Sequence, residues 1–140
     1  MLTVIIPYID RDAHLMERAV ASVTAQTIPA VALPVYDRDR RGPQWARNEG
    51  LRQAATPFVT WLDADDTLEP GFADACLNAY QPNHYVYTDY FRGADVHRLP
   101  DHKVCGAGGL YGVVTRLIRA ETARRVGGFD ESLKRLEDTE

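Results

Sequence analysis

Three carboxylates within four residues are the feature of this sequence best suited to chemistry. Asp63, Asp65 and Asp66 directly follow the apolar run FVTWL of residues 58–62. Like charges at this spacing raise one another's pKa unless a positive group lies among them. Carboxylate oxygens suit Mg²⁺ or Mn²⁺, and Mg²⁺ is usually held by one or two carboxylates together with substrate phosphates. We therefore expect a cation that bridges to a diphosphate; the alternative is that Asp63 and Asp66 only cap the turn into the next helix.

Acidic residues also follow the two earlier apolar runs. The first run, Leu2–Ile6, is closed by Pro7 and leads to Asp10, and the second, Val31–Tyr36, leads directly into Asp37. In open parallel sheets, ligands bind at the carboxyl ends of the strands. Three acidic strand endings at one edge of a sheet therefore predict a binding site there.

The elements that must position these residues alternate along the chain. Helices are expected from an N-cap at Asp12 to about Gln26, from Gly42-Pro43 to about Ala55, and from Pro70 to Tyr80. Strands are expected at Leu2–Ile6, Val31–Tyr36, Phe58–Leu62 and Tyr85–Thr88, with a loop at 91–110, a further strand or strand–helix junction at 110–118 and a short helix at 119–125. This order favours an α/β domain, with a mostly parallel sheet covered by helices on both faces.

Composition and charge exclude several classes of protein. The 140 residues fit one domain, and a net charge of -4 without a Lys/Arg run argues against nucleic-acid binding. The start of the chain has no basic segment typical of a signal peptide, and no stretch approaches the roughly 20 apolar residues of a membrane span. Cys76 and Cys105 are read as free thiols, which favours the cytoplasm.

Five segments, in order, resemble blocks of the family 2 glycosyltransferases, which have the Rossmann-like GT-A fold. The segments are VIIPYIDR, SVTAQTIP, GPQWARNEGL, TWLDADDTLEP and RAETARRVGGFDESLKRLED. The fourth resembles the strand that carries the family's Asp-x-Asp signature. Each block alone is weak, but the ordered set covers nearly the whole chain and is highly specific.

The resemblance implies a metal-dependent, inverting transfer from a nucleotide-sugar, most often a UDP-sugar in this family, to an unidentified saccharide, lipid or protein acceptor. It also implies residue roles. Pro7, Tyr8 and Asp37 would hold the nucleobase, with Arg47 near the nucleotide. Asp63 would contact the ribose or sugar, Asp65 would bind Mn²⁺ or Mg²⁺, and Asp138 would be the general base.

Two departures from the family leave alternatives open. The second strand ends in VYDRDRRG where the family usually has VVDDGS, so either Asp37 or Asp39 takes the base-binding role. The arginines of that segment are either solvated or reach toward the diphosphate. The sequence also stops at Thr139-Glu140, where the family usually continues into acceptor-side structure. We therefore expect either a minimal enzyme over residues 1–140 or its donor-binding half.

Two other functions remain as alternatives. The first is a non-catalytic module that binds a nucleotide-sugar without transferring it. The second is a phosphatase of the haloacid-dehalogenase type, whose first motif resembles residues 62–68, with Asp63 as nucleophile and Asp65 as general acid. That motif normally lies on the first strand, and the second alternative leaves the ARN and GGFDE segments unexplained.

Overall fold

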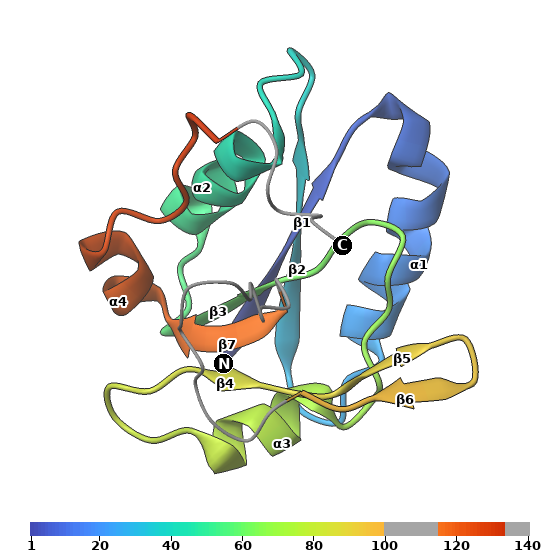
Figure 1. The fold of residues 1–140 in the computed structure, drawn as a ribbon, viewed down its shortest axis with the longest axis vertical. Helices are drawn as coiled ribbons and strands as arrows, with labels where there is room; N and C mark the ends of the chain where they lie inside the picture. The colour runs from blue at the N-terminus through green and yellow to red at the C-terminus, as the bar shows by residue number, and fades with distance from the viewer. Residues whose placement is uncertain (100–114, 134–140) are drawn as a thin grey trace.

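A central five-stranded sheet organises the protein, whose computed structural model describes residues 1–99 and 115–133 (Figure 1). Its strands are β1 Leu2–Tyr8, β2 Ala30–Tyr36, β3 Phe58–Trp61, β4 Val86–Tyr87 and β7 Arg116–Arg119, in the order β2-β1-β3-β7-β4. β1 is parallel to β2 and β3, β7 is antiparallel to β3, and β4 is antiparallel to β7. Because four of these five strands point the same way, the predicted α/β fold with a mostly parallel sheet is confirmed.

Helices cover both faces of the sheet. α1 (Ala13–Thr24) and α3 (Phe72–Ala79) lie on one face, whereas α2 (Pro43–Gln53) and α4 (Ala120–Arg125) lie on the other (Figure 1). Side chains of β1 alternate between the two cores, as the pleat of a strand requires. Leu2, Val4 and Ile6 pack toward α1 and α3, whereas Ile5 packs toward α2.

β1 is longer than the sequence suggests, because it continues through Pro7 to Tyr8. A proline lacks the N–H that a strand ladder normally uses. Here β3 pairs with β1 only as far as Ile5, and the last bond of that ladder is donated by the N–H of Leu62 to the carbonyl of Ile5. Pro7 is still in register with Val35 of β2, but it lies beyond the end of the β1–β3 ladder, so its missing N–H breaks no pairing with β3.

The start of the first helix also differs from the prediction. A short 3₁₀ turn, η1 (Asp10–Asp12), precedes α1, and the side chain of Asp12 makes no capping hydrogen bond. Its carboxylate instead accepts a hydrogen bond from Arg11 Nε at 2.9 Å. Asp12 is thus the N-cap residue of α1, as predicted, but its carboxylate is bound to the neighbouring arginine and caps no backbone N–H of the helix.

The predicted loop from residue 91 was wrong in its first part, where two short strands form a hairpin. β5 (Tyr90–Arg92) and β6 (Asp95–His97) are antiparallel and form a separate two-stranded sheet. Strands of three residues are too short to give a readable periodicity. Most of the predicted element at 110–118 lies outside the described residues, and its end forms the start of β7.

Two further features of the fold bear on the expectations. α4 ends before Gly127 and Gly128, which both have positive φ, as the sequence predicted. Among the described residues, no helix is both long and apolar enough to span a membrane.

Candidate functional site

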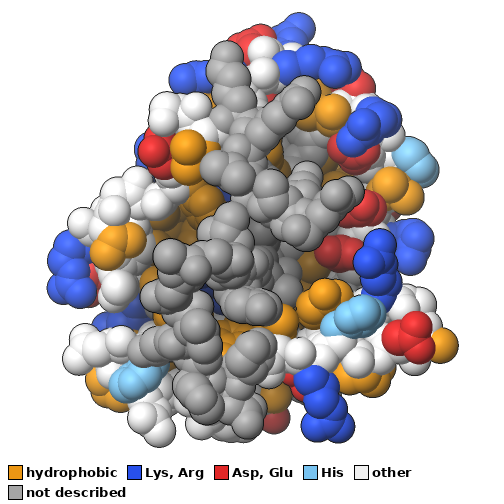
Figure 2. All heavy atoms as spheres, viewed as in Figure 1, with side chains coloured by type: hydrophobic (Ala, Val, Ile, Leu, Met, Phe, Trp, Pro, Cys, Tyr) orange, Lys and Arg blue, Asp and Glu red, His pale blue; other side chains and the backbone are white. Residues whose placement is uncertain are grey.

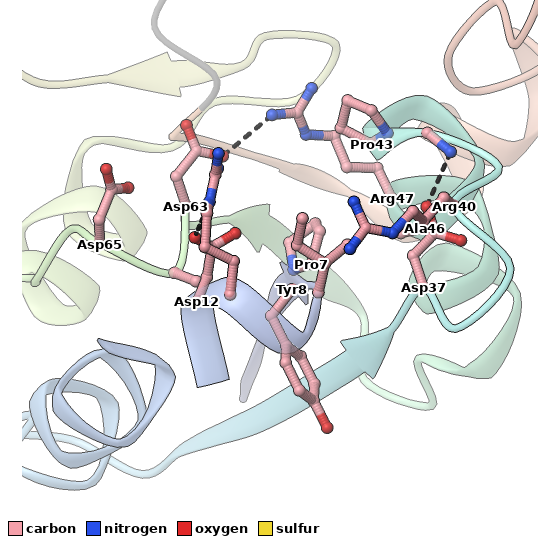
Figure 3. A pocket seen from close by; sticks show the side chains of 14 residues that line it. Pro7, Tyr8, Asp12, Asp37, Arg40, Pro43, Ala46, Arg47, Asp63 and Asp65 are labelled. Carbon is pink, nitrogen blue, oxygen red and sulfur yellow. Dashed lines mark hydrogen bonds and ion pairs between the residues drawn. The ribbon is translucent and has the colours of Figure 1, made fainter. Parts of the chain in front are cut away.

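The carboxyl ends of β1, β2 and β3 meet at one pocket of about 540 Å³. Tyr8 at the end of β1 pairs with Tyr36 at the end of β2, and the N–H of Asp37 donates to the carbonyl of Tyr8 at 2.9 Å. The start of α2 closes another side of the pocket. The predicted site residues that line it are Pro7, Tyr8, Asp37, Arg47, Asp63 and Asp65 (Figure 3).

The structure therefore brings together the six described residues to which a binding role was predicted, whereas Asp10, the acidic residue that follows β1, does not line the pocket. The predicted general base, Asp138, lies outside the described residues. The roles that the resemblance implies for these residues remain predictions.

An arginine lies beside the first of the clustered carboxylates. Arg47 Nη2 donates to Asp63 Oδ1 at 2.9 Å, with 2% of the arginine side chain and 40% of the aspartate side chain exposed. The guanidinium also lies over the ring of Phe129, 5.4 Å from its centre. This charge-assisted hydrogen bond fixes the carboxylate of Asp63 beside the guanidinium. The sequence predicted a positive group among the three clustered carboxylates. At Asp63 this group is the guanidinium of Arg47.

The other two carboxylates have different surroundings. Asp65 is exposed and lines the pocket, whereas Asp66 does not line it. Partial desolvation, and then the charges of Asp65 and Asp63, raise the pKa of Asp66 above its ordinary value. The alternative that Asp63 and Asp66 cap the following helix was wrong, because the N-cap of α3 is Gly71 and no side chain caps it.

These carboxylates could hold a metal only with help from a ligand. The described residues contain no group of three or more His, Cys, Asp or Glu side chains placed to bind a metal ion. Asp65 is available in the pocket, and Asp63 has one oxygen engaged by Arg47. This donor set fits Mg²⁺ or Mn²⁺ that takes its remaining ligands from phosphates and water, but not a cation enclosed by protein ligands.

Asp37 fixes the loop between β2 and α2. Its carboxylate, in a residue that is 4% exposed, accepts hydrogen bonds from the backbone N–H groups of Arg41 at 2.8 Å and Gly42 at 2.7 Å. A carboxylate has about four lone-pair sites, so it can accept further donors from a ligand. Asp39 is exposed and does not line the pocket, so the geometry favours Asp37 over Asp39 for contact with a bound ligand.

Aromatic side chains lie along the β1–β2 side of the site. The rings of Tyr8 and Tyr36 stack with centres 5.3 Å apart. The Tyr36 hydroxyl donates a short hydrogen bond to Asp10, and this bond is the main reason why the pKa of Tyr36 is raised. The ring of Tyr8 thus packs against the ring of Tyr36, which is held in place by its hydrogen bond to Asp10.

Asn48, on the helical turn that carries Arg47, binds the segment after α4. Its amide nitrogen donates to the Phe129 carbonyl at 2.9 Å and to Glu131 Oε1 at 2.8 Å, and its amide oxygen accepts from the Phe129 N–H at 2.8 Å. The ring of Phe129 packs edge-on against Trp61 at 5.0 Å. The segment that the sequence reads as GGFDE is therefore fixed beside α2 and the pocket.

Sequence analysis missed several residues of this site. Arg11 lines the pocket and Asn48 holds the segment after α4, yet neither was selected. Arg40 also lines the pocket, and the sequence had left it open together with the other arginines of its segment. The one available signal for Asn48 was its position next to Arg47, in a helix whose buried face is unusually polar. That face contains Gln44, Arg47 and Asn48 among its buried residues.

Comparisons with known proteins agree on the family. The family model described as "Glycosyl transferase family 2" matches residues 31–104. "Succinoglycan biosynthesis protein ExoW" of Rhizobium meliloti (strain 1021) is 36% identical, over 57% of this chain and 33% of the relative. The chain thus spans about a third of the length of this relative.

Solved structures show the same fold. S. aureus TarS 1-349 in complex with UDP matches 98% of this chain and 52% of its own chain, with a TM-score of 0.73 and 17% identity. A second structure of S. aureus TarS 1-349 matches 98% of this chain and 52% of its own chain, with a TM-score of 0.73 and 18% identity. At this level of identity the likeness establishes the fold alone, and the predicted GT-A fold is confirmed.

Proposed function

The chain belongs to glycosyl transferase family 2, and we propose that its strand-end pocket binds a nucleoside diphosphate sugar for transfer of the sugar to a hydroxyl acceptor. The observation that carries this proposal is the convergence of six residues predicted from the sequence on one pocket of about 540 Å³, at the ends of β1, β2 and β3 and the start of α2. A pocket of this size suits a small-molecule ligand such as a nucleotide-sugar. The UDP complex of TarS, a structure with the same fold, supports a UDP-sugar as donor. The family assignment sets aside the phosphatase alternative.

The β1–β2 wall is proposed to bind the nucleobase. Pro7 and Tyr8 present backbone and ring surface there, and the buried carboxylate of Asp37 can accept a hydrogen bond from a base N–H. Uracil offers such a donor. Arg47 and Asp63, fixed by their ion pair, lie on the opposite wall, and Asp63 keeps one oxygen for a ribose or sugar hydroxyl.

Metal dependence is part of the proposal. Asp65 would hold Mn²⁺ or Mg²⁺ together with the diphosphate, because it is exposed within the pocket and its carboxylate is a hard oxygen ligand. When bound, such a cation stabilises the negative charge that develops on a departing nucleoside diphosphate.

The transfer is proposed to invert the configuration of the sugar. The acceptor oxygen forms a bond to the anomeric carbon on the face opposite the diphosphate, and the bond to the diphosphate oxygen breaks. Asp138 takes the proton of the acceptor hydroxyl, as a carboxylate that is ionised at neutral pH can do. This role rests on the family resemblance of Glu137-Asp138.

Calorimetry with uridine, guanosine and adenosine diphosphates, each with Mn²⁺ and with EDTA, tests the donor site. We expect UDP to bind, and to bind more tightly with Mn²⁺. Asp65→Ala should remove the effect of Mn²⁺, whereas Asp39→Ala, a change of an exposed aspartate outside the pocket, should leave it intact. No binding of any nucleoside diphosphate in the presence of Mn²⁺ would contradict the proposed function.

Release of UDP from UDP-sugars separates an enzyme from a binding module. An enzyme should release UDP, at least slowly to water, and Asp138→Asn should stop this release while donor affinity is kept. Donor affinity without any release of UDP, over a panel of UDP-sugars and simple saccharide acceptors, would favour the non-catalytic module. Release that persists in Asp138→Asn would mean that the base lies elsewhere.

A further inference from the structure

Among the described residues that line the pocket, one cationic side chain forms no ion pair with a carboxylate. Three arginines line it, namely Arg11, Arg40 and Arg47. Arg11 is paired with Asp12 and Arg47 with Asp63, each at 2.9 Å. The side chain of Arg40 makes no hydrogen bond or ion pair with any of residues 1–99 or 115–133.

The backbone of Arg40 adopts a conformation that is unfavourable for this residue type. Its φ is +52°, in the left-handed region, which costs a residue other than glycine about 1–2 kcal/mol. Asp37 maintains this conformation, because its carbonyl accepts from the Arg40 N–H at 3.3 Å and its carboxylate binds the next two backbone N–H groups. Such strain, held by surrounding contacts, is typical of functional positions. The loop thus holds Arg40 in place at the pocket.

The other two arginines of this loop point elsewhere. Arg41 stacks over the ring of Trp45 at 4.6 Å, and Arg38 is exposed and does not line the pocket. Basic side chains gather over the β2–α2 loop, at the top of the view in Figure 2. Of the three arginines that sequence analysis left as either solvated or phosphate-directed, the geometry selects Arg40 alone.

The start of α2 does not supply this positive charge by itself. Gly42 and Pro43 line the pocket, but the carboxylate of Asp37 already binds the N–H of Gly42. Across the pocket from Arg40 lies Asp65 (Figure 3). A dianionic group between the two would meet the negative charge of Asp65 on one side and the guanidinium of Arg40 on the other.

We propose that Arg40 binds the diphosphate of the donor and supplies a positive charge that is present whether or not a metal is bound. The inference rests on the proposed function, and it assigns to Arg40 the recognition of the diphosphate within that ligand. Arginine suits this task because its planar donors match phosphate oxygens. The affinity gap between UDP and uridine should therefore persist in EDTA.

Arg40→Gly is a sharp test, because glycine adopts the required φ without strain and removes only the side chain. Binding of UDP, UMP and uridine is measured in EDTA for the wild type, Arg40→Gly and Arg40→Lys. Arg38→Gly serves as a matched control from the same loop. We expect Arg40→Gly to weaken UDP at least about tenfold, as for one hydrogen bond to a charged group, and to leave uridine unchanged. Arg40→Lys should recover part of the loss, and Arg38→Gly should match the wild type.

Two outcomes would overturn the inference while leaving the proposed function in place. One is wild-type affinity for UDP in Arg40→Gly. The other is an equal loss of UDP and uridine, which would show that the loop shapes the pocket and does not bind phosphate. If the wild type binds no nucleoside diphosphate even with Mn²⁺, the proposed function fails and this inference fails with it.

Discussion

Gly50→Ala tests how the pocket is positioned, because Gly50 lets α2 lie directly on β1. A Cβ at this position would lie 2.2 Å from Ile5 Cγ2 and 3.1 Å from Ile5 Cγ1. Ile5 is fully buried in the middle of the sheet, so it has no room to move aside. Overpacking of this kind costs about 1–3 kcal/mol, and the contact is short enough to place the cost near the upper end. The better helix propensity of alanine returns about 1 kcal/mol, which leaves a net loss of about 2 kcal/mol.

Thermal and denaturant unfolding measure this loss. A net loss of about 2 kcal/mol should lower the Tm by about 7 °C for a chain of this length. Gly71→Ala is the matched control, because nothing lies within 4 Å of its added Cβ, and its effect should stay below about 1 kcal/mol. Because α2 carries Arg47, the displaced helix should also weaken UDP binding.

A double-mutant cycle identifies the cause of the Gly50→Ala effect. Ile5→Val keeps the Cγ2 methyl group, so Gly50→Ala should remain destabilising in that background. Ile5→Ala removes the two nearest groups and leaves only Ile5 Cβ, at 3.2 Å, so Gly50→Ala should there be much less destabilising. A Gly50→Ala protein as stable as the wild type, or an equal loss in all three backgrounds, would refute the reasoning.

Three other predictions concern charge, burial and backbone. The pKa of Asp66 is raised in the folded state, so this carboxyl lowers the stability of the protein as the pH rises through that pKa. Asp66→Asn removes the charge beside Asp65 and should therefore raise the Tm near pH 7. At about pH 3, where the carboxyl is protonated, the substitution should give no gain in Tm. Burial raises the pKa of the Cys76 thiol to about 11, so iodoacetamide at pH 8 should leave Cys76 unmodified in the native protein. Mass spectrometry should detect the modification only after unfolding. Labelling of the native thiol would contradict its burial. Gly128→Ala places a Cβ 2.4 Å from Asn48 Oδ1, at a residue whose φ is +70°. The substitution should therefore lower the denaturant midpoint by the equivalent of at least about 1–2 kcal/mol of unfolding free energy. An unchanged midpoint would contradict the Asn48 contacts.

The sequence predicts those parts of the site that follow from strand order. Asp37 and Asp63 come directly after apolar runs, and parallel strands necessarily bring such residues to one edge of the sheet. For the same reason Pro7 and Tyr8 were found at the pocket. The three apolar runs are long enough to be recognised as strands, and each is ended by a proline or an aspartate, so the residues at the strand ends can be identified from the sequence.

The ion pair of the site could not be predicted in this way. Whether Arg47 reaches Asp63 depends on how α2 is rotated and how closely it approaches β1, and the contact at Gly50 decides both. The Asn48 contacts depend on a segment 81 residues away in the chain. Arg40 depends on a single backbone angle that non-glycine residues seldom adopt. These are tertiary effects that local propensity does not encode.

A crystal structure of the protein with UDP and Mn²⁺ is the most direct test of the central claim. We expect the uracil against Tyr8 and Asp37, and the diphosphate between Asp65 and Arg40, in the pocket at the ends of β1, β2 and β3. UDP bound at a different surface, with this pocket unchanged, would contradict the account.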